Sequence, residues 1–293
     1  MGADVRKMRV AFQGEPGAFS EAAAVQLLGE EIITVPRPTF DAVFRAIADG
    51  VANALLVPVE NSLAGSVVRV YDLLVESGLT ITAETILPIE LNLIGCPGAS
   101  LGDIRSISSH PVALAQCERF FNAHPQWKRT TAEDTAGSVR EIIARGDKSA
   151  AAIAGRRAAA HYDGVILAER IQDNPENFTR FVLLVPPQLQ VRETERSNLP
   201  SMLKMSLALR LAHRPGALLA ALEPFARHGV NLLKIESRPI HGRPWEYQFF
   251  LDVETETPQH LEAALADVRK ATSDLRSLGL YRAARNNSAA PAK

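Results

Sequence analysis

A polar loop that runs directly into an apolar segment carries the residues best placed to do chemistry. The loop reads Asp173-Asn-Pro-Glu-Asn-Phe-Thr-Arg-Phe181, and Val182-Leu-Leu-Val185 follows it as a short β-like run. Polar side chains just ahead of a buried strand are held rigidly, as the floor of a ligand cleft requires. A threonine hydroxyl there can donate a hydrogen bond, and an arginine can clamp a carboxylate or brace the loop. A solvated connector between a helix and a strand fits the same pattern, so both interpretations stay open for the loop alone.

Two strand–polar turn–helix arrangements upstream would supply backbone N–H donors. Residues 8–12 are typical of a strand, Gln13-Gly-Glu-Pro-Gly17 of a turn and residues 19–28 of a helix. A second buried strand leads through Glu60-Asn-Ser62 to a helix at 67–77. Glycines let the backbone approach a ligand, and free N–H groups at a helix start favour an anion. The glycine spacing differs from the dinucleotide fingerprint, and a plain tight turn explains the first arrangement equally well.

The patterning around these turns predicts an α/β domain. Repeated alternation of strands and helices predicts a parallel sheet with ligands at the carboxyl ends of its strands. Neutral polar residues ahead of helices suit a small carboxylate ligand, although a lone histidine is more often structural than catalytic. Such polar positions are Ser20, Asn61–Ser62, Ser109–His110 and Thr135. Further predicted helices lie at 39–47, 112–122 and 156–162, and further predicted strands lie at 79–84, 127–132, 149–154 and 165–168. Residues 104–111 are predicted as a strand that runs into a turn.

The composition is that of an ordinary globular protein. A length of 293 residues suggests two domains, and a net charge of −1 predicts no nucleic-acid partner. No apolar run is long enough to span a membrane and the first seven residues lack a secretory signal, so we expect a cytoplasmic protein without a membrane partner. Cys96 and Cys117 are too far apart for a short metal or redox motif, and we predict that they are buried apolar residues. We predict no metal and no cofactor.

Four groups of motifs resemble prephenate dehydratase, in its monofunctional bacterial form with a C-terminal ACT domain. They occur in family order and cover almost the whole first domain. The resemblance implies two α/β lobes like a type II periplasmic binding protein, with the active site between them. The motifs are Gly14-Glu-Pro-Gly-Ala-Phe-Ser20, Val57-Pro-Val-Glu-Asn-Ser62, Ser109-His-Pro111 with Ala115-Gln-Cys117, and Ile171-Gln-Asp-Asn-Pro175 with Thr179-Arg-Phe181.

This resemblance also implies the domain boundaries. We place the catalytic domain at 8–185, with lobe crossings near 83–87 and 166–170. Because the first strand begins near Met8, we expect no room for the N-terminal chorismate mutase domain of the family's bifunctional forms.

The activity implied by the resemblance is the decarboxylative dehydration of prephenate to phenylpyruvate in L-phenylalanine biosynthesis. Because the ring becomes aromatic, the enzyme must orient the substrate, hold two carboxylates and help a hydroxide leave, without a strong base. The resemblance assigns Thr179 as the hydrogen-bond donor or general acid to that hydroxyl. It implies as substrate-binding residues Ser20, Asn61, Ser62, Ser109, Gln116, Thr135 and Arg180. It implies as supporting residues Glu60, His110 and Phe181.

Two positions depart from the family pattern beside the expected cleft. Val112 stands where the family often has glutamine, and Asp134-Thr-Ala-Gly137 stands where it usually has a Ser/Thr-Thr-Ala-Ala run. They bear on the fine substrate contacts and leave the reaction class unchanged. Arogenate dehydratase, or use of both substrates, is the alternative. A catalytically silent protein that binds small carboxylates shares the fold and is a further alternative.

The rest of the chain has a different pattern. A proline-bounded polar linker is predicted at 186–202, then a βαββαβ (ferredoxin-like) domain at 203–282, then a disordered tail at 283–293. Arg214-Pro-Gly-Ala-Leu218 and Glu236-Ser-Arg-Pro239 resemble a phenylalanine-sensing ACT domain. The resemblance implies feedback inhibition by L-phenylalanine, bound where two such domains pair in a homodimer or homotetramer. The implied effector-binding residues are Gly216, Ala217, Leu218, Asn231, Glu236, Ser237, Arg238 and Pro239.

Overall fold

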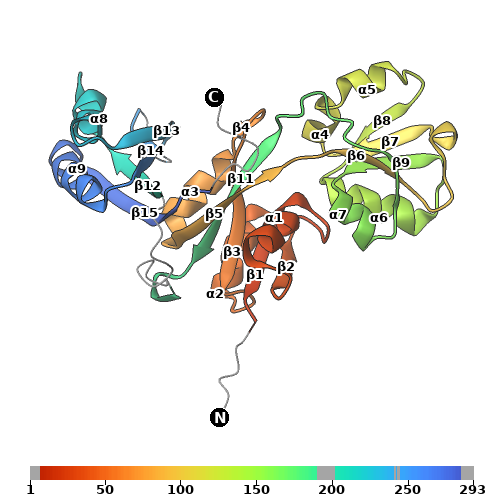
Figure 1. The fold of residues 1–293 in the computed structure, drawn as a ribbon, viewed down its shortest axis with the longest axis horizontal. Helices are drawn as coiled ribbons and strands as arrows, with labels where there is room; N and C mark the ends of the chain where they lie inside the picture. Colours follow the sequence, from red (N-terminus) through yellow and green to blue (C-terminus); the bar gives the residue numbers. More distant parts are fainter. Residues whose placement is uncertain (1–6, 190–201, 241, 243–244, 285–293) are drawn as a thin grey trace, which may run out of the picture. The chain divides into compact units, whose positions relative to one another are not determined.

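A computed structural model describes residues 7–189, 202–240, 242 and 245–284 (Figure 1). The chain divides into two compact units. The first contains the residues up to Val70 and Thr85–Phe181, and the second contains Tyr71–Glu84 and the residues from Val182 onwards. The predicted domain boundaries stay a prediction, and most of the predicted linker and tail, 190–201 and 285–293, lies outside the described residues.

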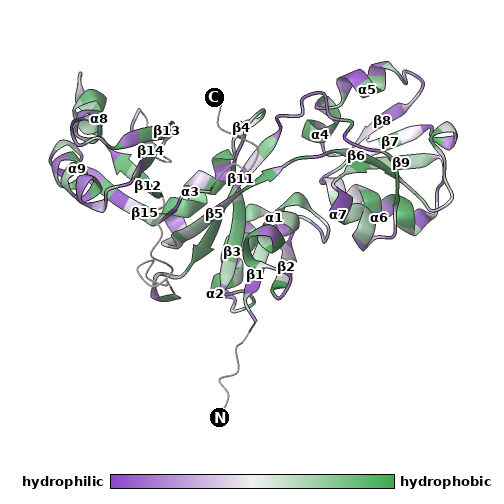
Figure 2. Ribbon diagram, viewed as in Figure 1, coloured by the Kyte–Doolittle hydropathy of each residue, from purple (hydrophilic) through white to green (hydrophobic). Residues whose placement is uncertain are grey.

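The first sheet has six strands in the order β2-β1-β3-β11-β5, with β4 paired to the end of β3. β1 runs parallel to both β2 and β3, as the alternating pattern predicts. Hydrophobic residues are frequent along β3 (Figure 2), and Leu55, Leu56 and Val57 of this strand are fully buried. The strands are β1 (Arg9–Gln13), β2 (Ile33–Arg37), β3 (Ala54–Asn61), β4 (Gly65–Ser66), β5 (Thr80–Pro88) and β11 (Phe178–Val185). The helices are α1 (Phe19–Leu28), α2 (Phe40–Ala48) and α3 (Val68–Ser77).

A second sheet, wholly in the first unit, has the order β10-β6-β9-β7-β8. Helices α4 and α5 lie on one face of it, and α6 and α7 lie on the other (Figure 1). Its strands are β6 (Asn92–Gly95), β7 (Ser106–Ser109), β8 (Lys128–Thr131), β9 (Ala150–Ala154) and β10 (Val165–Ala168). The helices around it are η1 (Leu101–Asp103), α4 (Pro111–Ala115), α5 (Glu118–Asn122), α6 (Thr135–Arg145) and α7 (Arg156–His161).

The chain passes between the two sheets later than the predicted crossings near 83–87 and 166–170. β5 extends to Pro88 and β6 starts at Asn92, so the first passage falls at 89–91. The second passage falls between Ala168 and Phe178 and contains the first part of the predicted polar loop. Residues 178–181, predicted as the end of that loop, belong to β11 instead. Pro88 ends β5 because proline has no N–H to donate to a neighbouring strand.

Helix 112–122 was predicted as one piece but is two helices, α4 and α5. The break has a cause distant in sequence. The Asp173 carboxylate accepts hydrogen bonds from the backbone N–H groups of Glu118 and Arg119, at 2.9 Å each. These are the first N–H groups of α5, so Asp173 caps a new helix start.

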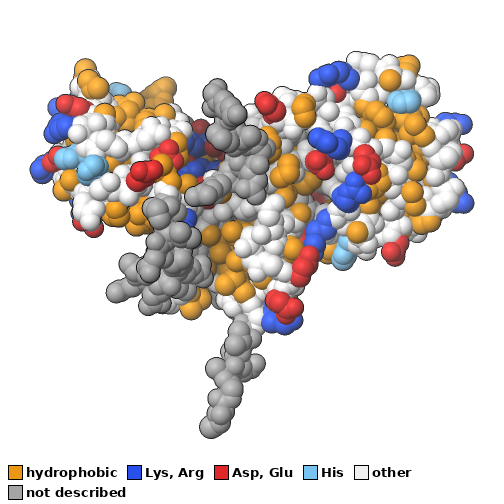
Figure 3. Space-filling view, in the orientation of Figure 1, with side chains coloured by type: hydrophobic (Ala, Val, Ile, Leu, Met, Phe, Trp, Pro, Cys, Tyr) orange, Lys and Arg blue, Asp and Glu red, His pale blue; other side chains and the backbone are white. Residues whose placement is uncertain are grey.

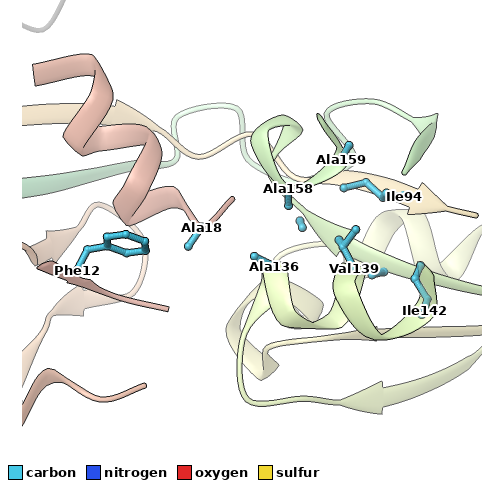
Figure 4. Close-up of a cluster of buried hydrophobic side chains, with 10 residues drawn as sticks. Phe12, Ala18, Ile94, Ala136, Val139, Ile142, Ala158 and Ala159 are labelled. Carbon is cyan, nitrogen blue, oxygen red and sulfur yellow. The ribbon is translucent and has the colours of Figure 1, made fainter. Parts of the chain in front are cut away.

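Small side chains let the two lobes of the first unit meet closely. A hydrophobic cluster joins Phe12 and Ala18 of the first lobe to Ala136 and Ala158 of the second (Figure 4). Gly17 has φ +85°, and a Cβ there would lie 2.6 Å from the Ala158 Cα, so only glycine fits.

Two ion pairs border this cluster. Arg140 lies 2.7 Å from Glu15, and Arg157 lies 3.1 Å from Glu21. Burial raises the pKa of the Glu21 carboxyl, but hydrogen bonds from the Gly17 N–H, Thr34 and Arg157 outweigh it, and the pKa falls below its ordinary value.

The second unit contains an antiparallel sheet in the order β13-β14-β12-β15. The chain order βαββαβ confirms the predicted ferredoxin-like arrangement. α8 and α9 lie side by side over a core that includes Leu207, Phe225 and Val268. The elements are β12 (Leu203–Arg210), α8 (Ala217–Arg227), β13 (Asn231–Pro239), β14 (Tyr247–Thr255), α9 (Pro258–Ala271) and β15 (Asp274–Arg282), preceded by the short helix η2 (Pro187–Leu189).

Residues 71–84 pack against this sheet within the second unit. The Tyr71 and Phe250 rings lie 4.9 Å apart. Gly279 approaches β5 so closely that a Cβ would lie 2.1 Å from the Ile81 carbonyl oxygen. Lys204 and Glu84 form a buried ion pair at 3.1 Å. The second half of α3 and the start of β5 thus belong to the core of this unit.

Charged side chains of both signs are interspersed on the face shown in Figure 3. This fits the near-zero net charge of the sequence. Among the described residues, no helix has the length and apolar character needed to cross a membrane.

Candidate active site

A cavity of about 290 Å³ lies in the first unit. Its walls come from the β1–α1 turn, the end of β3, the first passage between the sheets, the starts of α4 and α6, and the start of β11. Thr179 lies in the cavity wall although it is only 8% exposed. The cavity is therefore built by both lobes and by the first passage between them.

A hydrogen bond holds the Thr179 hydroxyl oxygen in place. The Asn61 Nδ2 donates to Thr179 Oγ1 at 2.9 Å. The orientation of the Asn61 amide follows from its other end, where Oδ1 accepts from the N–H groups of Leu63 and Ala64 at 3.0 and 2.8 Å. Because Thr179 Oγ1 is the acceptor in this bond, its own hydrogen is left to donate elsewhere, and the residue faces the cavity.

A second asparagine extends this network to the other lobe. The Asn177 Oδ1 accepts from Asn61 Nδ2 at 2.8 Å, and Asn177 Nδ2 donates to Gln116 Oε1 at 3.0 Å. Gln116 lies in the cavity wall, at the end of α4. The chain of amides therefore runs from Gln116 through Asn177 and Asn61 to Thr179.

Helix starts supply further N–H groups at the cavity. The N-cap of α1 is Ala18, whose side chain caps nothing, and Phe19 and Ser20 line the cavity. At α6 the Asp134 carboxylate accepts from the Gly137 N–H at 2.6 Å, and Thr135 beside it lines the cavity. Uncapped N–H groups at the start of α1 are available to a carboxylate ligand.

The carboxylates of the cavity wall face no described lysine or arginine of that wall. No lysine or arginine lines it among the residues that the structure describes, whereas Glu133 and Asp134 do. His110 also lines it, but its Nδ1 accepts the Val112 N–H at 3.2 Å and so caps α4. The donors that the described wall offers to an anion are therefore neutral side chains and helix starts.

Of the eleven residues predicted for catalysis, substrate binding or support, seven line one cavity. These are Ser20, Asn61, His110, Gln116, Thr135, Thr179 and Phe181. The structure therefore brings together motifs that are far apart in sequence.

Ser62, Ser109, Arg180 and Glu60 are not among the described residues of the cavity wall. Ser62 Oγ donates to the Glu176 carbonyl at 2.9 Å and accepts the Phe178 N–H at 3.0 Å, which ties it to the polar loop. Ser109 is fully buried and donates to the Ile153 carbonyl at 2.6 Å. Both hydroxyls are therefore used on the backbone, and the prediction that they contact substrate finds no support in this geometry.

The position of Arg180 follows from strand geometry. Successive side chains of a strand point to opposite faces, so Arg180 in β11 points away from the face that carries Thr179 and Phe181. The same rule places Asn177 on the face of Thr179, because the two are two residues apart. Sequence reasoning missed Asn177, and this spacing is the signal that identifies it.

The predicted effector-binding residues fall at two ends of one sheet. Arg210 of β12 pairs with Gln248 of β14, which pairs with Arg238 of β13, so the α8 start after β12 lies at the Arg238 end. That end therefore holds Gly216, Ala217, Leu218 and, along β13, Glu236, Ser237, Arg238 and Pro239. Asn231 is at the other end of β13, roughly 16 Å from Glu236 for five residues of strand.

Comparison with known families matches both parts of the chain. A family model described as prephenate dehydratase matches residues 10–188, and one described as ACT domain matches residues 205–270. The chain belongs to the prephenate dehydratase family. It is thus a member of a hydro-lyase family, and the predicted fold class, enzyme class and C-terminal ACT domain are confirmed.

The chain is similar to one curated protein and two solved structures in particular detail. The Arabidopsis thaliana protein arogenate dehydratase/prephenate dehydratase 1, chloroplastic, is 37% identical over 293 residues, which cover 95% of this chain and 73% of that protein. A solved prephenate dehydratase from Arthrobacter aurescens in complex with L-Phe has a TM-score of 0.83 and 32% identity, covering 97% of this chain and 92% of that one. A structure described as GqqA, a novel type of quorum quenching acylase, has a TM-score of 0.84 and 34% identity, covering 94% and 98%.

Proposed function

We propose that the cavity binds prephenate and catalyses its decarboxylative dehydration to phenylpyruvate. The observation that carries the proposal is that Thr179 lines the cavity while its hydroxyl oxygen accepts the Asn61 hydrogen bond. This bond leaves the hydroxyl hydrogen for the departing oxygen of a substrate. A fixed neutral donor in a site shielded from water stabilises developing charge more than the same donor in bulk water.

The reaction needs no strong acid or base. The ring carboxylate leaves as carbon dioxide, and the electron pair of its C–C bond enters the ring. The ring C–O bond breaks at the opposite carbon, the ring becomes aromatic and hydroxide departs, to be neutralised by a proton from the solution. Thr179 stabilises the departing oxygen by one hydrogen bond, and general acid assistance of this kind typically contributes about 10²- to 10⁴-fold.

The substrate carboxylates are held by neutral donors in this proposal. Ser20 and the uncapped start of α1 hold one, and Gln116 and Thr135 hold the other from the second lobe. Asn61 orients Thr179. The proposed role of Arg180 is to brace the polar loop from the opposite face of β11, and Phe181 packs against the ring.

Supporting roles go to residues behind the wall. We propose that Ser62 and Ser109 hold the loop and the second sheet, as their hydrogen bonds to backbone carbonyls support. Glu60 orients its neighbours, and His110 caps α4.

Arogenate is the second candidate substrate, alone or alongside prephenate. Relatives named arogenate dehydratase support it, and one of them, arogenate dehydratase 4 of Arabidopsis thaliana, is 37% identical. Arogenate carries an ammonium group where prephenate has a ketone, so it is the less negative of the two. A cavity wall with Glu133 and Asp134 and no described cation favours the less negative ligand.

We propose that L-phenylalanine inhibits the enzyme through the ACT domain. A relative of known structure was solved with L-Phe bound, which supports an amino-acid effector here. The α8 start at Gly216 would hold the carboxylate, and Asn231 with nearby carbonyls would hold the ammonium. Since Asn231 lies at the far end of β13, a second copy with an antiparallel β13 would bring the two sets together. This geometry supports a homodimer or homotetramer.

Helix α3 offers a route from effector to cavity. Arg238 lies 3.5 Å from Asp72 on α3, with both side chains in the second unit. Helix α3 begins directly after the segment that carries the cavity residues Asn61, Ala64 and Val67. Inhibition requires only that phenylalanine binds two arrangements of this helix with different affinities.

The compartment is also a proposal. We propose that the enzyme acts in the cytoplasm, which the free, buried thiols of Cys96 and Cys117 support. Fractionation of cells with detection of the intact chain tests this.

The deciding experiment follows product formation from prephenate and from arogenate in parallel, with and without phenylalanine. Phenylpyruvate from prephenate, suppressed by phenylalanine, is the expected result. Turnover of arogenate alone would identify arogenate, and not prephenate, as the substrate. No turnover of either substrate would favour a catalytically silent protein that binds small carboxylates. If the protein instead hydrolysed an amide substrate, its activity would resemble that of the structure described as an acylase.

A further inference from the structure

Asn177 occupies a position that neither the family motifs nor the reaction chemistry explain. Its side chain is completely buried, with 0% exposure, and it does not line the cavity. Burying an amide is costly unless its donor and acceptor are both satisfied. Both are satisfied here, and by two residues of the cavity wall, Asn61 and Gln116.

These two partners belong to different lobes. Asn61 ends β3 of the first sheet, and Gln116 ends α4 beside the second. The Asn177 backbone carbonyl also accepts the Ile89 N–H at 2.7 Å, which joins the two chain passages between the lobes. One buried residue thus connects both lobes and both passages.

We propose that Asn177 is a positioning residue that sets the Thr179 hydroxyl and the Gln116 amide at the same time. Its Oδ1 accepts from Asn61 Nδ2, and this bond, together with those from the Leu63 and Ala64 N–H groups to Asn61 Oδ1, holds the amide that donates to Thr179. Its Nδ2 engages Gln116 Oε1, and this turns Gln116 Nε2 toward a ligand as a donor. The inference rests on the proposed function of the cavity and adds a residue that touches no substrate.

The arrangement has a consequence for substrate binding. A ligand that draws Gln116 toward itself pulls on Asn177, and through Asn61 it acts on the hydroxyl that assists departure. Binding on the second lobe and donor alignment on the first are therefore coupled through one amide. Buried amide networks of this kind are rigid because each member has a single satisfied orientation.

The test compares Asn177→Ala and Asn61→Ala with the double variant. We expect Asn177→Ala to lower kcat by about 10- to 100-fold, as small misplacements of catalytic groups do. If Asn177 acts through Asn61, adding Asn177→Ala to Asn61→Ala lowers kcat little further. The isosteric Asn177→Asp keeps the acceptor for Asn61 and should retain more of kcat than Asn177→Ala.

Asn92→Ala is the matched control. Asn92 is also buried, at 1% exposure, and its amide makes hydrogen bonds to the Glu90 and Ala154 carbonyls and the Arg170 N–H, away from the cavity wall. It should lower the unfolding temperature without lowering kcat.

Two outcomes would overturn the inference alone. One is an Asn177→Ala enzyme whose kcat falls no more than that of the control, and the other is a kcat loss that adds fully to that of Asn61→Ala. A parent enzyme without turnover of either substrate would overturn the proposed function and this inference with it. If Asn177→Ala fails to fold, Asn177→Asp is the deciding variant. It keeps the oxygen that accepts from Asn61, so a kcat for Asn177→Asp as low as that of Asn61→Ala would contradict the role proposed for this oxygen.

Discussion

The cavity wall and the surface between the ACT sheet and residues 71–84 use opposite kinds of polar contact. In the cavity, neutral groups form the central chain, from Gln116 through Asn177 and Asn61 to Thr179. Against the ACT sheet, the contacts include two ion pairs, and in one of them Lys204 and Glu84 are almost fully buried at 9% and 1% side-chain exposure. Neutral amides fix a geometry without titrating, whereas a buried charge depends on its partner for stability. Neutral hydrogen bonds therefore hold the cavity residues, whereas ion pairs contribute to the contact between residues 71–84 and the ACT sheet.

The largest effect is expected at Thr179. Thr179→Val keeps the shape of the side chain and removes the hydroxyl, so kcat should fall about 10²- to 10⁴-fold. Thr179→Ser keeps the donor and should retain most of kcat. Steady-state kinetics with prephenate, alongside thermal unfolding of both variants, checks this. A Thr179→Val enzyme that keeps most of the parent kcat would remove the hydroxyl from the mechanism.

Breaking the buried ion pair should be the largest effect on stability. Lys204→Met leaves the Glu84 carboxylate buried without its cation and should destabilise the protein by about 3–5 kcal/mol. Adding Glu84→Leu should recover much of this loss, because a packed apolar pair replaces the charges. Denaturant unfolding measures both. An equal loss in the single and the double variant would show that packing, and not charge, holds this surface.

A smaller loss of stability is expected at Glu21, between the lobes. Glu21→Gln weakens the contacts to Gly17, Thr34 and Arg157 and should cost about 1–3 kcal/mol. The folded-state pKa of Glu21 lies below its ordinary value of 4.5. Its carboxylate therefore stabilises the protein fully above that value, and the contribution is lost as pH falls through the lower folded pKa. Unfolding curves of parent and variant should converge in acid, and parallel curves would contradict this.

The smallest effect should appear in regulation. Asp72→Asn removes the charge facing Arg238 at a half-buried position and should weaken inhibition by phenylalanine about 5-fold, the lower range of measured couplings. The kcat without phenylalanine should stay close to that of the parent. Inhibition curves check this. Asp41→Asn is the control, because Asp41 pairs with Arg69 of α3, the same helix as Asp72, and both Asp41 and Arg69 belong to the first unit. Equal effects of both variants would argue against a route through Arg238.

The sequence was sufficient for the elements and for most of the cavity. Strand and helix periodicities predicted the α/β order, and motif residues such as Ser20, Asn61 and Thr179 meet because strand ends and helix starts converge. The rest depended on contacts between distant segments. Asp173 divides the helix predicted at 112–122, and no local signal reports a cap from that distance. Ser62 and Ser109 have the right type and spacing for binding, but backbone carbonyls engage their hydroxyls.

The most direct test of the central claim is the pH dependence of kcat for prephenate. Hydroxyl and amide groups such as Thr179, Asn61 and Gln116 do not titrate near neutral pH, so kcat should be flat across that range. A bell-shaped profile would mean that an ionising acid or base takes part. If that profile flattened in His110→Gln, the histidine at the cavity wall would be the group responsible, and an account based on neutral donors would be contradicted.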